Sequence, residues 1–201
     1  MNDLDEIAGE HVYVVHFSTS LANDHEIYFP DNLKHVLENP TQYCLCASAF
    51  TQTMLANGIY ALQFGVGLII ETALEQNEQF TDTCCSYGGG RQIRAASNGD
   101  LGSNRVEPPC IPIDSIVSRD DIRNSLAPPA NGHNEWVVKP PHNILGIFMN
   151  GINPKVQVLG IKNGNREVPA YKTTDLKEIR KLFYDLPVWI FNDGKVTKQA
   201  P

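Results

Sequence analysis

Residues 65–71, Gly-Val-Gly-Leu-Ile-Ile-Glu, constrain the fold of this 201-residue chain more than any other segment. A strand with one wet face alternates apolar and polar residues, whereas a continuous apolar run is typical of a strand covered on both faces. The chain must therefore supply packing layers on both sides of this strand. Hydrophobic residues make up 42% of the sequence, which is enough for one core. We expect a single domain over residues 1–201, since domains hold about 100–200 residues.

The rest of the chain mixes strands and helices without a regular alternation, which predicts the α+β class. A core over residues 12–150 is followed by a C-terminal hairpin, helix and strand over residues 151–201. Apolar and β-branched runs predict strands at residues 12–18, 42–47, 135–138, 143–149 and 187–191. Helical spacing predicts helices at residues 32–38, 49–62 and 175–184, and a tight turn at Asn163-Gly164-Asn165 predicts a hairpin.

Residues 74–130 show little periodicity and carry Gly88-Gly89-Gly90 and several prolines. Loops of this length without strong structure are usually functional or disordered. Residues 114–124 are the one place in this segment where we expect a short helix.

Charge and hydropathy exclude several classes of protein. The net charge of −7 disfavours nucleic acid as a partner, because an acidic chain repels phosphates. Residues 54–70 carry no charge, but they contain glycines and fall short of the ~20 residues that cross a bilayer. We therefore expect a buried helix and strand there and no membrane span. The acidic first ten residues lack the pattern of a signal peptide. This predicts a cytoplasmic protein, or one delivered into a host cytoplasm without a cleavable signal.

The five cysteines predict neither a metal site nor a functional disulfide. Their spacing matches no usual zinc motif, and the expected compartment is reducing. They are Cys44, Cys46, Cys84, Cys85 and Cys110.

Three polar residues occupy informative positions on predicted strands. His16 lies in an apolar strand, where it is either a satisfied core residue or a ligand-binding group. Ser48 follows the strand 42–47, where it either caps the next helix or belongs to a site. Glu135 opens the strand Glu-Trp-Val-Val, where it either faces solvent or serves as a functional acid.

Together these residues and their flanking segments resemble the mono-ADP-ribosyltransferase family over about residues 12–150. The likeness includes Cys46-Ala47-Ser48-Ala49-Phe50, the strand 67–71, and Glu135-Trp136-Val137-Val138 followed by residues 144–148. Members have an α+β fold of two small, packed, mostly antiparallel sheets with a cleft for NAD. With His16 and no arginine in the first strand, the chain is similar to the histidine-type subclass of these toxins and effectors.

The resemblance implies that the chain cleaves NAD and transfers ADP-ribose to an acceptor. Glu135 would be the catalytic carboxylate, His16 would bind the adenosine-side ribose, and Ser48 would orient Glu135. Arg91 and Arg94 would contact the NAD pyrophosphate. The ring that stacks on nicotinamide would be one of Tyr13, Phe17, Tyr60 or Phe64.

The acceptor implied by the resemblance is unknown, with protein favoured over nucleic acid. His133 stands two residues before Glu135, where members that modify protein arginine carry Gln or Glu. Arginine is therefore not indicated as the acceptor.

Two alternatives stay open. In a papain-like cysteine hydrolase, Cys46 would be the nucleophile, activated at the start of a helix, with His133 or His142 as its base. A non-enzymatic binding or inhibitory protein of a phage or pathogen would use the long loop as its contact surface.

Overall fold

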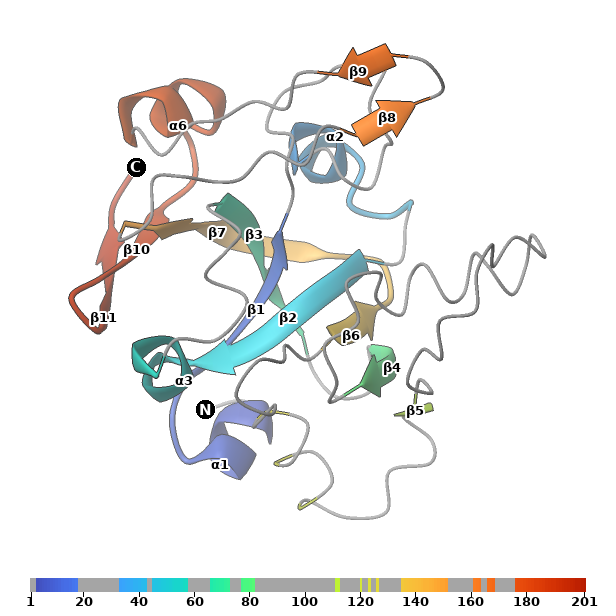
Figure 1. Ribbon diagram of the computed structural model, residues 1–201, viewed down its shortest axis with the longest axis vertical. Helices are drawn as coiled ribbons and strands as arrows, with labels where there is room; N and C mark the ends of the chain where they lie inside the picture. Colours follow the sequence, from blue (N-terminus) through green and yellow to red (C-terminus); the bar gives the residue numbers. More distant parts are fainter. Residues whose placement is uncertain are drawn as a thin grey trace.

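The fold is described from a computed structural model of the chain (Figure 1). The structure describes residues 3–17, 33–42, 45–57, 66–72, 77–81, 111–112, 120, 123, 126, 135–151, 161–163, 166–168 and 176–201. The expected helix at residues 114–124, most of the segment 74–130 and the turn of the hairpin lie largely outside these residues.

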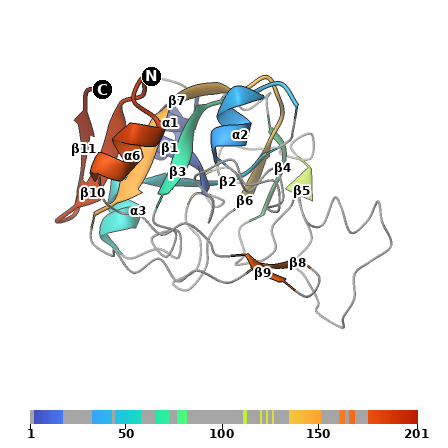
Figure 2. The ribbon, with the colours of Figure 1, turned by 90° about the horizontal axis from the view of Figure 1, so that it is seen from above.

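Nine of the described strands form one hydrogen-bonded sheet in the order β11-β10-β7-β3-β1-β2-β6-β4-β5 (Figures 1 and 2). Neighbouring strands are antiparallel except β7 and β10, which are parallel. The strands are β1 (Val12–Phe17), β2 (Leu45–Thr51), β3 (Val66–Glu71), β4 (Asn77–Thr81), β5 (Ile111–Pro112), β6 (Glu135–Val138), β7 (Asn143–Asn150), β10 (Val188–Asn192) and β11 (Lys195–Gln199).

The remaining elements are short. A separate hairpin joins β8 (Ile161–Asn163) to β9 (Arg166–Val168). The helices include α1 (Asp3–Ala8), α2 (Leu33–Glu38), α3 (Gln52–Ala56) and α6 (Leu176–Leu182). This combination of a mostly antiparallel sheet with a few short helices confirms the α+β class.

The arrangement of the strands differs from the expected pair of sheets. In the described residues, β2 hydrogen-bonds β1 on one side and β6 on the other. It therefore joins the strands from β11 to β1 and the strands from β6 to β5 into one curled sheet. The C-terminal strands β10 and β11 belong to the same sheet, next to β7. The part after residue 150 is therefore structurally continuous with the core.

Two clusters of buried side chains cover the two faces of the sheet. The larger cluster includes Val14, Ala47, Leu68, Trp136, Ile147 and Val188 from the strands, together with Leu33 and Val36 of α2, Ile179 of α6 and Phe183, which follows α6. The aromatic cluster consists of Tyr13, Val15, Phe50, Leu55, Ile69, Phe148 and Phe191, with Phe17, Met54, Trp189 and Val196 packed against it. Because β3 supplies Leu68 to one cluster and Ile69 to the other, its predicted burial on both faces is confirmed.

The predicted boundary between the second strand and its helix is wrong. The strand β2 extends to Thr51, and the helix α3 covers only Gln52–Ala56 among the described residues. Thr51, not Ser48, is the N-cap, and its hydroxyl oxygen accepts a hydrogen bond from the Met54 N–H at 3.3 Å. The residues Ala49 and Phe50 are apolar on alternating faces, which suits a strand as well as a helix.

Gly67 allows β1 and β3 to pack closely beneath the aromatic cluster. It pairs with Phe17 on β1 and Phe148 on β7, and these two rings meet edge-on with centroids 5.8 Å apart. A Cβ atom at residue 67 would lie 2.5 Å from Val15 Cγ1 and 2.7 Å from the His16 carbonyl oxygen. A side chain there therefore requires the backbone of β1 to move.

We expect Gly67→Ala to lower the free energy of unfolding by about 1–3 kcal/mol, the usual cost of an overpacked core. Urea denaturation followed by circular dichroism measures this change. The control is Lys195→Ala on the exposed strand β11, which should stay within about 0.5 kcal/mol of the wild type. Equal stability of the two variants would contradict the close packing at Gly67.

Candidate functional site

The three strands that carry His16, Ser48 and Glu135 are neighbours in the sheet, in the order β1-β2-β6. Ser48 pairs with Val15, and the preceding residue of β2, Ala47, pairs with Trp136. Because β2 and β6 are antiparallel, Ser48 and Glu135 occupy the next opposing positions after the Ala47–Trp136 pair. Their backbones are therefore adjacent across β2 and β6, although 87 positions separate their numbers in the sequence.

His16 lies on the other face of the sheet from Ser48. His16 pairs with Leu68 of the larger cluster, whereas Ser48 pairs with Val15 of the aromatic cluster. Residues paired across strands share a face, and successive residues of a strand point to opposite faces. His16 is 3% exposed and Ser48 is 7% exposed. The structure thus brings Ser48 beside the backbone of Glu135 but does not bring His16 to the same face.

The structure describes the backbone of Glu135 as the first residue of β6, paired with Thr81 of β4. Arg91, Arg94 and His133 lie outside the described residues, as do Tyr60 and Phe64. Their roles stay predictions.

The premise of a helix-activated Cys46 is wrong. Cys46 lies within β2 and pairs with Val137 of β6, so no helix begins next to it. The effect of a helix dipole is confined to about the first turn, and α3 begins only at Gln52. His142 is buried in the connection between β6 and β7, and its backbone N–H donates to the Pro40 carbonyl at 2.8 Å. The argument that favoured Cys46 as the nucleophile of a cysteine hydrolase therefore does not hold.

The aromatic rings of Tyr13 and Phe17 pack against other rings of the aromatic cluster. Tyr13 stacks on Phe50 with centroids 6.1 Å apart, and Phe17 stacks on Phe50 at 6.0 Å. Phe50 meets Phe148 edge-on at 5.3 Å. Ser48 lies two residues before Phe50 on β2, on the face of the sheet that these rings cover. The neighbourhood of Ser48 on this face is therefore apolar and aromatic.

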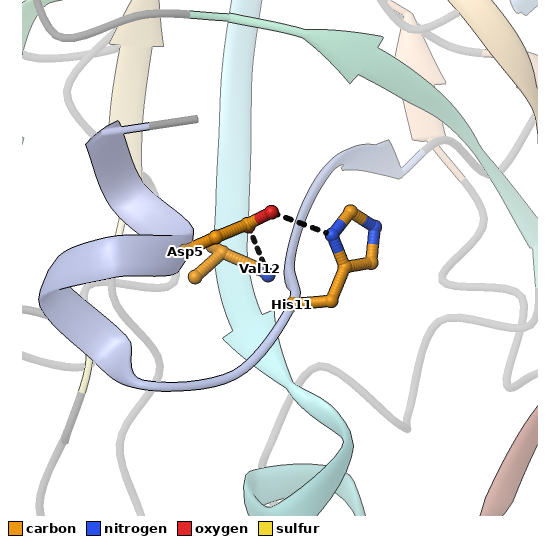
Figure 3. Close-up of polar contacts among 3 residues, drawn as sticks. All are labelled: Asp5, His11 and Val12. Atoms are coloured by element: carbon orange, nitrogen blue, oxygen red, sulfur yellow. Dashed lines mark hydrogen bonds and ion pairs between the residues drawn. The ribbon is translucent and has the colours of Figure 1, made fainter. Parts of the chain in front are cut away.

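A polar cluster around Asp5 connects α1 to β1 and was not predicted from the sequence (Figure 3). One carboxylate oxygen of Asp5 accepts the Val12 N–H at 2.8 Å, and the other lies 3.2 Å from His11 Nδ1. The Asp5 side chain is 13% exposed and that of His11 is 54% exposed. The carboxylate therefore satisfies a buried backbone donor at the first residue of β1 and also holds the His11 ring.

The acidic residues of this region also affect Tyr13. Glu10 accepts hydrogen bonds from the Thr53 hydroxyl at 3.1 Å and from the Thr53 N–H at 3.4 Å, in the first turn of α3. The His11 ring meets the Tyr13 ring edge-on, with centroids 4.5 Å apart. Burial, together with the negative charges of Asp5 and Glu10, raises the pKa of the Tyr13 phenol above its usual value.

The signal for this cluster was present in the sequence but is short. Leu4 and Ile7 have the spacing of a helix face, and both are buried in the larger cluster. The helix could not be predicted from this spacing, because six residues give too few turns for a reliable helical pattern.

We expect Asp5→Ala to lower the free energy of unfolding by about 1–3 kcal/mol, since it leaves the buried Val12 N–H without its acceptor. Asp5→Asn keeps an amide oxygen as acceptor and should lose less. His11→Ala removes a largely exposed partner of Asp5, which is worth at most about 1 kcal/mol, together with the edge-on contact of its ring with Tyr13. Chemical denaturation of the three variants tests this order. A loss in His11→Ala as large as in Asp5→Ala would contradict the leading role of the hydrogen bond between Asp5 and the Val12 N–H.

The raised pKa of Tyr13 predicts a loss of stability at alkaline pH. Below the ordinary tyrosine pKa of about 10, the phenol is protonated in both the folded and unfolded states. As the pH rises further, the unfolded state ionises first, so unfolding becomes more favourable until the folded pKa is passed. The free energy of unfolding should therefore fall less steeply above pH 10 in Tyr13→Phe than in the wild type. Identical slopes in denaturation curves measured at pH 9 to 11 would contradict this prediction.

In the part of the chain that the structure describes, no helix is both long enough and apolar enough to cross a lipid bilayer. The comparison with known proteins gives no assignment: no protein-family model matches this sequence, and neither does any curated protein.

Proposed function

We propose that this chain is an NAD-cleaving enzyme of the mono-ADP-ribosyltransferase type, with Glu135 as the catalytic carboxylate and Ser48 as its positioning neighbour. The observation that supports this proposal is the adjacency of Ser48 and Glu135 across β2 and β6. The sequence resemblance implies that Ser48 orients Glu135, and the neighbouring positions of β2 and β6 in the sheet support this.

A carboxylate at the start of β6 suits the chemistry of NAD cleavage. Breaking the bond between nicotinamide and ribose develops positive charge on the ribose, as in glycoside hydrolysis. A fixed negative charge beside that sugar stabilises the transition state more than the ground state, because ground-state NAD does not yet carry the ribose charge. The acceptor nucleophile then bonds to the ribose carbon that nicotinamide leaves.

The proposal gives Ser48 the task of orienting Glu135. A serine hydroxyl donates one hydrogen bond, and an ionised carboxylate accepts several. Ser48 is nearly buried within a central strand, so its own position is fixed by the sheet. A rigid hydroxyl of this kind limits the rotamers of a neighbouring glutamate.

His16 has no part in the proposed catalytic step. The resemblance assigns it to the adenosine-side ribose, but it lies on the opposite face from Ser48, among residues of the larger cluster. Arg91 and Arg94 stay candidates for the pyrophosphate, as the resemblance implies. Two guanidinium groups would offset the repulsion between NAD and a chain of net charge −7.

We expect Glu135→Gln to slow the release of nicotinamide from NAD by about 10²–10³-fold while NAD binding changes little. Glutamine keeps the shape and hydrogen-bonding capacity of glutamate but lacks the charge that stabilises the developing cation. Nicotinamide release is measured with and without cell extract as a source of acceptor. Binding is measured in parallel as the shift in melting temperature at saturating NAD.

Four further variants, at three positions, identify the enzyme class. Cys46→Ser should be almost silent, whereas a cysteine hydrolase requires Cys46. His16→Ala should lower stability without changing the KM for NAD, whereas a ribose-binding histidine would raise it. Ser48→Ala should lower kcat more than it changes KM, and Ser48→Thr should restore part of the rate. Full activity in Glu135→Gln would refute the proposed mechanism, and an inactive wild type that does not bind NAD would favour a non-enzymatic binding protein.

A further inference from the structure

The strand β11 forms one edge of the described sheet, and side chains from two helices bind backbone groups there, one within the strand and one at Ala200, the residue that follows it. β11 is the last strand in the sheet order and pairs with β10 on one side. On its other side, the Val196 N–H donates to Gln52 Oε1 of α3 at 3.0 Å. Arg180 of α6 donates from Nη2 to the Ala200 carbonyl at 2.7 Å. An added strand would otherwise pair with these two backbone groups, the Val196 N–H and the Ala200 carbonyl.

The alternation of the strand makes these two contacts consistent with each other. In an antiparallel pair, the backbone N–H and C=O of every second residue point away from the partner strand. Val196 and Lys198 differ by two positions, so their outward groups lie on the same edge, and Ala200 follows directly after the end of the strand. The edge thus presents a bound donor, the backbone groups of Lys198, and a bound acceptor.

The two helices reach this edge from opposite faces of the sheet. Ile179 of α6 belongs to the larger cluster, and Leu55 of α3 belongs to the aromatic cluster on the other face. Figure 1 shows α6 and α3 on either side of β11, and Figure 2 shows β11 at the margin of the molecule. Contacts from both sides restrict the directions from which another strand can approach.

Lysines add a further obstacle to strand pairing. Lys195 and Lys198 are exposed on this five-residue strand, and the Lys198 ammonium lies 4.6 Å from the centroid of the Trp189 ring. Charged residues on an edge strand discourage a second edge from pairing, because a like strand brings its own lysines close to them. Association of two copies through β11 would therefore require both loss of the side-chain bonds and close approach of like charges.

We propose that the hydrogen bonds of Gln52 and Arg180 to the backbone at this edge prevent β11 from pairing with the β11 strand of a second copy of this chain. A strand edge without such hydrogen bonds is a template for pairing, since it offers a row of unsatisfied N–H and C=O groups. This role is independent of NAD chemistry, because neither residue belongs to the proposed catalytic site.

The test is the sedimentation of the double variant Gln52→Ala/Arg180→Ala at increasing protein concentration. We expect the double variant to form a larger species at concentrations at which the wild type does not change. The matched control is Gln52→Glu/Arg180→Lys, which keeps an acceptor for Val196 and a donor for Ala200 and should sediment as the wild type does. A folded double variant that sediments as the wild type does would overturn the proposal.

Adding Lys198→Pro to the double variant tests whether any association passes through this edge. Proline removes the outward N–H of residue 198 without removing a bond to β10, and it is tolerated on strand edges. The triple variant should return to the wild-type species, and continued association would overturn the proposal.

Hydrogen exchange keeps the proposal testable if the double variant does not fold. In the single variant Gln52→Ala, the Val196 amide should exchange faster than in the wild type, while the amide of Thr197 is unchanged. Unchanged protection of the Val196 amide would show that Gln52 does not occupy this backbone donor, and it would overturn the proposal.

Discussion

Burial of the central strands on both faces is the constraint on which the rest of the described structure depends. β1 and β3 contribute alternate residues to the larger cluster and to the aromatic cluster, so neither strand can slip by one residue without exchanging the two cores. Gly67 strengthens this constraint, because the backbones of β1 and β3 approach too closely for a side chain there. The register of β2 is fixed by its pairing with β1, and the register of β7 by its pairing with β3.

That register decides which candidate residues meet. Ser48 reaches the aromatic face together with Val15, and Trp136 reaches the other face together with Ala47. The connection from β6 to β7 is short, whereas the chain between β2 and β6 is long. The adjacency of Ser48 and Glu135 is therefore a product of long-range pairing. An active site placed here would be held by the sheet itself, on rigid strands instead of a loop.

Much of the central sheet could be predicted from the sequence, because β1, β3 and β7 are continuous apolar runs. The site could be predicted only in part. Whether His16 or Val15 shares a face with Ser48 depends on a register that joins residues far apart in the chain, and no local pattern contains it. The sequence left open whether Ser48 caps a helix or belongs to a site, because serine favours caps; the N-cap is Thr51, which carries the same kind of hydroxyl at the end of the strand. The strand β11 was missed because an edge strand exposed to solvent reads as a polar loop.

The two faces of the sheet also place the tryptophans in different environments. The chain contains two tryptophans, and each lies on its own face: Trp136 is fully buried in the larger cluster, and Trp189 packs against the aromatic cluster beneath Lys198. A buried indole emits at shorter wavelength than one near water and a charged ammonium. We therefore expect each tryptophan to report on a different part of the protein, Trp136 on the side of the sheet that α2 and α6 cover and Trp189 on the margin near β11.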